Sequence, residues 1–122
     1  KEIYKLERIK VVSGNIDMPY AKVIIKDING NLIEAEQSGN GPVDAVFKAI
    51  NTVINETESL VLYRYSVSSV TEERESLGET SVTLKENEDL YTGVGTHTDI
   101  ITSSAIAYID AINKAIEGKA KK

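Results

Sequence analysis

Hydrophobic and polar positions alternate along the first third of the chain, which predicts β-strands there. Residues 4–12 and 20–28 are rich in β-branched and aromatic side chains, which favour strands. Asn29 and Gly30 follow, and both residue types tolerate the positive φ angles of a tight type I′ turn. We therefore expect residues 31–37 to fold back on residues 20–28 as a hairpin.

The pattern then changes to a helical period. After the glycine pair Gly39 and Gly41, apolar residues recur at the i, i+3, i+4 and i+7 spacing of a helix with one apolar face; they are Val43, Val46, Phe47, Ile50, Val53 and Ile54. Pro42 is compatible with the first helical turn, and Asp44 in that turn is stabilised by the helix dipole. The first half is therefore predicted to be βββα.

The second half follows the same plan. Residues 61–70 and 78–86 alternate as strands, and a turn at residues 87–89 leads into a further strand over 90–94. The acidic residues 71–76 have no apolar face and are expected to form a solvated loop. Of the two tyrosines on the first of these strands, Tyr63 and Tyr65, only one is expected to face the core.

A second helix completes the repeat. Its apolar face is predicted to hold Ile101, Ala105, Tyr108, Ile112 and Ile116. Thr96 and Asp99 have the spacing of a capping box at its start, and Gly118 is the residue type preferred just beyond a helix end. We predict an α+β fold of duplicated βββα units within one domain, residues 1–122, in which the sheets pack with two helices. The first repeat would span about residues 3–58 and the second about 60–118.

Composition excludes several function classes. The chain has 122 residues and a net charge of −5, so it repels nucleic acid, and no apolar run approaches the roughly 18 residues of a membrane span. It has no cysteine and one histidine, which excludes disulfides, thiolate chemistry and Cys-ligated zinc. The lack of cysteine and of an apolar leader stretch favours the cytoplasm. No cofactor or metal is expected in this chain.

Two glycine pairs precede the predicted helices, and helix starts after such turns can bind anions through free N–H groups. Neither pair matches a nucleotide-binding fingerprint, and the glycines could simply allow a sharp turn. Asp44 and Asp99 would partly neutralise the helix starts, which favours a zwitterionic ligand such as an amino acid. His97 could line such a site or be an exposed loop residue. No catalytic residue is identified, because no triad or isolated acid pair is present.

Three stretches together resemble the C-terminal regulatory domain of the isopropylmalate synthase and citramalate synthase family. They are residues 39–50 (GNGPVDAVFKAI), residues 65–67 with 78–84 (YSV and GETSVTL), and residues 93–101 running on through 104–113 (GVGTHTDII and SAIAYIDAIN). The resemblance implies a homodimeric domain that binds a branched-chain amino acid, leucine or isoleucine, and inhibits a separate catalytic barrel. That barrel would condense acetyl-CoA with a 2-oxo acid and would use a divalent metal.

By motif position, the resemblance implies one ligand site made from both halves of the chain, with residues Gly41, Val43, Asp44, Leu62, Tyr65, Val82, Gly95, His97, Thr98 and Asp99. Backbone N–H groups at a helix start would bind the ligand carboxylate, and a carboxylate or carbonyl would bind its ammonium group. The side chains of Leu62, Tyr65 and Val82 would contact its aliphatic part. Three alternatives remain open: a generic sensor of ACT-like role, whose elements would run βαββαβ; a small transferase or hydrolase using His97; and a purely structural dimerisation module.

Overall fold

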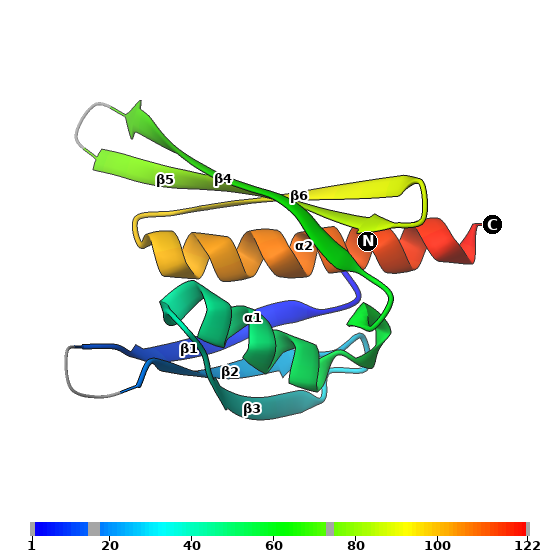
Figure 1. The fold of residues 1–122 in the computed structure, drawn as a ribbon, viewed down its shortest axis with the longest axis horizontal. Coiled ribbons are helices and arrows are strands. Elements are labelled where there is room, and N and C mark those ends of the chain that lie inside the picture. The colour runs from blue at the N-terminus through cyan, green and yellow to red at the C-terminus, as the bar shows by residue number, and fades with distance from the viewer. Residues whose placement is uncertain (1, 15–17, 73–74, 122) are drawn as a thin grey trace. The chain divides into compact units, whose positions relative to one another are not determined.

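The chain forms two compact units, each with one sheet and one long helix. The computed structural model describes residues 2–14, 18–72 and 75–121, and they divide into an N-terminal unit (Glu2–Asn55) and a C-terminal unit (Glu56–Lys122). Each unit contains a three-stranded antiparallel sheet followed by an α-helix (Figure 1). The predicted α+β fold with duplicated βββα units is therefore confirmed.

The N-terminal unit packs one helix on one face of its sheet. Its elements are β1 (Lys5–Val12), β2 (Tyr20–Lys26), β3 (Leu32–Ser38) and α1 (Pro42–Val53), and a short 3-10 helix, η1 (Asn55–Thr57), follows. Ala21, Val23 and Ile25 alternate along the central strand β2 and are fully buried. Gln37, which pairs with Ala21, donates to the Thr52 hydroxyl of α1 at 3.1 Å. The buried face of β2 is therefore the one that α1 covers.

The predicted tight turn at Asn29 and Gly30 is wrong. Lys26 pairs with Leu32, so the connection spans residues 27–31, and of its residues only Gly30 has a positive φ, +87°. The Asp27 carboxylate accepts the backbone N–H groups of Asn29 and Asn31, both at 2.9 Å. An aspartate side chain therefore closes a wider loop, because Asp side chains readily bond to the backbone a few residues ahead.

The C-terminal unit has longer strands than the sequence pattern suggested. Its elements are β4 (Val61–Glu72), β5 (Glu75–Glu86), β6 (Asp89–His97) and α2 (Ile100–Ala120). The expected loop at 71–76 is wrong in large part, since Thr71 pairs with Ser76 and Glu72 with Glu75; residues 73–74 lie outside the described part of the chain. An apolar face is unnecessary here, because the backbone ladder continues into a hairpin without it.

A bulge at Tyr63 separates the two tyrosines of β4. Leu62 pairs with Leu84 and Arg64 with Thr83, so the register shifts between them. In a regular strand, the side chains of residues two apart lie on the same face of the sheet. A bulge adds a residue, so the side chains before and after it can lie on opposite faces. The Tyr65 hydroxyl lies 2.7 Å from the Ser104 Oγ of α2, and the Tyr63 ring centroid lies 5.4 Å from the Lys85 Nζ. Only Tyr65 faces the helix, as expected of one of the pair.

Strand β6 lies directly against α2, and this closeness explains its glycines. A Cβ atom on Gly95 would overlap backbone atoms of Ser103 and Ala107, and one on Gly93 would overlap those of Ala107 and Ala111. The glycines lie inside the strand: β6 continues to His97, so the predicted strand end at residue 94 is wrong. Glycines inside a strand commonly mark such close backbone approach.

The boundaries of α2 also differ from the prediction. Thr96 lies within β6, and Asp99 is itself the N-cap, accepting the Thr102 backbone N–H at 3.1 Å. The helix passes through Gly118 to Ala120, where a Cβ atom on Gly118 would lie 2.7 Å from Cε1 of the Tyr91 ring. Gly118 therefore gives room to an aromatic ring instead of ending the helix. In the described parts of the chain, no helix combines the length and apolarity required to cross a membrane.

Candidate functional site

The start of α1 carries three of the predicted ligand-binding residues. Gly41 is the N-cap and forms no side-chain cap, and Val43 and Asp44 follow in the first turn. Asp44 Oδ2 accepts the Asn40 backbone N–H at 2.8 Å and lies 3.1 Å from the Lys48 Nζ. These interactions, the Asn40 N–H first and then Lys48, lower the pKa of Asp44. An ionised carboxylate therefore already occupies this helix start.

Gly39 allows the backbone to wrap around that carboxylate. A Cβ atom at this position would lie 2.5 Å from the Ala45 backbone nitrogen and 2.7 Å from Asp44 Oδ2. In contrast, a Cβ atom on Gly41 would meet no atom within 4 Å. The two glycines of the first motif therefore differ: Gly39 is required for packing, and Gly41 leaves open space beside the helix start.

Three predicted residues share the α2 side of the second sheet. Leu62 and Tyr65 pair with Leu84 and Val82, and Val82 is fully buried whereas Leu62 is 47% and Tyr65 36% exposed. A small molecule can reach Leu62 and Tyr65 from solvent, but Val82 is already covered. Tyr65 is anchored by its hydroxyl contact with Ser104.

The remaining predicted residues lie in the last part of β6 and in the short connection that follows it. His97 is the exposed last residue of β6, Thr98 and Asp99 form the exposed connection to α2, and Gly95 lies farther back inside β6. His97 Nδ1 accepts the Asp99 backbone N–H at 2.9 Å. The Thr102 hydroxyl first, and then the backbone N–H groups of Thr102 and Ile101, lower the pKa of Asp99. His97 and Asp99 thus stabilise this connection locally.

A buried polar cluster lies between β5 and the start of α2, and the sequence patterns did not identify it. The Thr80 hydroxyl lies 2.7 Å from the Ser103 Oγ, and both Ser103 and Ser104 donate to the Ile100 carbonyl, at 2.9 and 2.8 Å. Thr80, Ser103 and Ser104 are fully buried. Two adjacent serines within an apolar helix were the only available signal. The cluster joins the first turn of α2 to the central strand and, through Tyr65, to β4.

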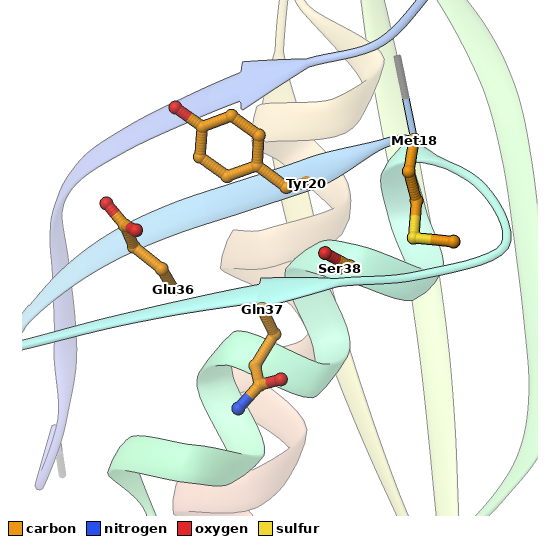
Figure 2. A pocket seen from close by; sticks show the side chains of 5 residues that line it. All are labelled: Met18, Tyr20, Glu36, Gln37 and Ser38. Atoms are coloured by element: carbon orange, nitrogen blue, oxygen red, sulfur yellow. The ribbon is translucent and has the colours of Figure 1, made fainter.

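The N-terminal unit also contains an open depression of about 420 Å³, lined by Met18, Tyr20, Glu36, Gln37 and Ser38. Tyr20 and Glu36 stand on the side of the sheet away from α1, whereas Gln37 points toward the helix (Figure 2). A smaller depression of about 220 Å³ is lined by Arg8, Ile9, Lys10, Lys22 and Ile24. Neither is lined by a residue that the sequence analysis assigned to the ligand site.

The structure thus brings the predicted residues together in groups. Gly41, Val43 and Asp44 are neighbours in the N-terminal unit, and the others belong to the C-terminal unit. A single site made from both groups stays a prediction. Among the residues described, no three His, Cys, Asp or Glu side chains are placed to hold a metal ion.

Comparison with known proteins identifies relatives over nearly the whole chain. The sequence model described as the LeuA allosteric (dimerisation) domain matches residues 1–116. A 2-isopropylmalate synthase of Acetivibrio thermocellus is 76% identical over 121 residues, which are 99% of this chain and 24% of that protein. The 2-isopropylmalate synthases of Brevibacillus brevis and Synechocystis sp. are 40% and 43% identical, over 95% and 93% of this chain and 22% and 21% of their own lengths. The chain therefore spans between a fifth and a quarter of the length of these relatives.

Proposed function

Because the chain belongs to the LeuA allosteric (dimerisation) domain family, we propose that it is the regulatory and dimerising part of a 2-isopropylmalate synthase. In this role it binds a branched-chain amino acid, leucine or isoleucine, and feedback-inhibits a catalytic barrel in the cytoplasm. The barrel, an acyltransferase, condenses acetyl-CoA with a 2-oxo acid and uses a divalent metal. The observation that carries the proposal is the 76% identity to a 2-isopropylmalate synthase over 121 residues.

The charges at the α1 start support an amino acid as the ligand. Asp44 is ionised and half exposed, and it is held against the N-terminal turn by Asn40 and Lys48. A second anion alone would be repelled there, whereas a zwitterion offers an ammonium group to the carboxylate and a carboxylate to free backbone N–H groups. The open space beside Gly41 is where such a ligand would approach.

The element order favours this proposal over the ACT-like alternative. The chain runs βββα twice, which differs from the βαββαβ order of those modules. Its similarity to 2-isopropylmalate synthases also favours that parent over a citramalate synthase. The enzyme alternative has little support, since His97 is used to accept the Asp99 backbone N–H.

Calorimetric titration of the chain with leucine, isoleucine and valine tests the proposal. We expect saturable heat with leucine or isoleucine, and weaker binding of valine, because one missing methylene group changes affinity by about 1–3 kcal/mol. No heat with any of the three would contradict the sensing role.

Substitutions on β4 make the test specific. Tyr65→Ala should weaken binding, while Tyr63→Ala is the matched control, because the bulge places Tyr63 on the other face of the same strand. Equal weakening in both variants would argue against a ligand contact at Tyr65. Circular dichroism would verify that both variants remain folded.

A further inference from the structure

The four edge strands of the two sheets differ in how well they are protected. An edge strand presents unpaired N–H and C=O groups, and natural proteins shield them with charged side chains or with a covering element. β1 carries Lys5, Glu7, Arg8 and Lys10, and β3 carries Glu34 and Glu36. Both edges of the first sheet are therefore protected against pairing with another strand.

The edge at β6 is protected by the helix. The Asp110 carboxylate of α2 accepts the Val94 backbone N–H at 3.0 Å, and the Lys114 Nζ donates to the Thr92 carbonyl at 3.0 Å. Backbone groups that a further strand would need are thus already occupied. This strand is also the one that packs closest to α2, through Gly93 and Gly95.

Strand β4, at the opposite edge, has neither protection. It is 12 residues long, contains no proline, and has Arg64 as its single charged residue between positions 61 and 69. Leu62, Tyr65 and Val67 lie on the side of the sheet that faces α2, as their partners Leu84, Val82 and Thr80 do. They nevertheless remain 47%, 36% and 44% exposed, because α2 packs on β5 and β6.

We propose that β4 is the surface through which a second copy of this chain binds, by antiparallel pairing of the two β4 edges. The occupant is a second copy because the chain belongs to a family described as a dimerisation domain. Among the described residues, β4 has a single charge over positions 61–69, unlike β1 and β3, and α2 packs on β5 and β6 instead of along β4. An isologous pair would join two three-stranded sheets into one, with the apolar side chains of both β4 strands adjacent. This inference rests on the dimerising role proposed above and assigns it to named residues.

Sedimentation equilibrium of the chain and two variants tests the interface. Val67→Lys places a charge in the apolar row of β4, twice in each dimer, and we expect the dissociation constant of the dimer to rise about tenfold or more. Val94→Lys is the matched control, because Val94 is also 44% exposed but lies on β6. This control should dimerise like the unsubstituted chain.

Each outcome decides between the proposals. A dimer that Val67→Lys leaves unchanged, or that Val94→Lys dissociates instead, overturns the β4 interface while dimerisation itself stands. An unsubstituted chain that sediments only as a monomer overturns both. Circular dichroism and thermal unfolding check that the variants are folded, and Leu62→Lys provides a second test of β4 if Val67→Lys does not fold. Concentration-dependent protection of β4 backbone amides from hydrogen exchange should accompany the dimer.

Discussion

At the scale of single residues, Asp27, Asp44 and Asp99 each accept a hydrogen bond from a backbone N–H group close by in the sequence. Asp27 closes the β2–β3 loop, Asp44 binds the Asn40 N–H before α1, and Asp99 caps α2. In each case hydrogen bonds to the ionised form lower the pKa of the carboxyl group. The sequence identified Asp44 and Asp99 as helix-start residues, but their acceptor bonds required the actual backbone path.

The lowered pKa values predict acid sensitivity. A group whose pKa is lower in the folded state contributes stability that is present above its unfolded pKa, about 3.9, and is lost as the pH falls through the folded value. The contribution of these three groups to the free energy of unfolding should therefore be fully present above about pH 5 and decline below about pH 4. Urea titrations at a series of pH values would measure this, and Asp99→Asn should make the decline shallower because it removes one of the three groups.

Gly41→Asp separates binding from folding. The φ angle of Gly41 is −162°, which any residue adopts, and a Cβ atom there meets no neighbour within 4 Å. An Asp at an N-cap is favoured over Gly by a few tenths of a kcal/mol, so thermal unfolding should stay unchanged or shift slightly upward. The added charge should weaken amino-acid binding in calorimetry. Unchanged binding would place the ligand away from α1.

At the scale of elements, the close contact of β6 and α2 should depend on its glycines. Gly95→Ala would force a Cβ atom against the backbone of Ser103 and Ala107, and overpacking of this kind typically costs about 1–3 kcal/mol. Chemical denaturation would show the loss. Gly14→Ala is the control, because its Cβ atom would meet nothing within 4 Å, and it should change stability by less than about 0.5 kcal/mol. Equal effects would contradict the packing role of Gly95.

Element types were predictable from the sequence, whereas several boundaries were not. Periodicity identified the strands and helices because the core residues repeat at spacings of 2 and 3.6, as Ala21, Val23 and Ile25 illustrate on β2. The strand end before Gly95 and the helix end at Gly118 were predicted wrongly, because the sequence alone does not distinguish a glycine required for close packing from one that ends an element. The buried serines Ser103 and Ser104 were missed because their partners lie across the sheet.

At the scale of the whole molecule, ligand binding should increase the free energy of unfolding. A ligand that binds only the folded state at 100 times its dissociation constant adds about 2.7 kcal/mol to the free energy of unfolding. We therefore expect leucine or isoleucine to raise the melting temperature of the unsubstituted chain and to have a smaller effect on Gly41→Asp. D-Leucine is a suitable control, because it has the same charges and side chain with the opposite handedness. Equal stabilisation by both enantiomers would point to a non-specific effect.

The contacts of Asp110 and Lys114 with β6 also limit how far assembly can proceed. If both edge strands of the sheet could pair, each added chain would expose a new edge strand for the next chain, and growth would continue into fibres. Because α2 occupies the β6 edge, pairing of two copies through their β4 edges, as proposed above, would leave no edge of this sheet open among the described residues. Two side chains of α2 would thus limit the assembly to a dimer, and replacing both with alanine would be expected to favour aggregation.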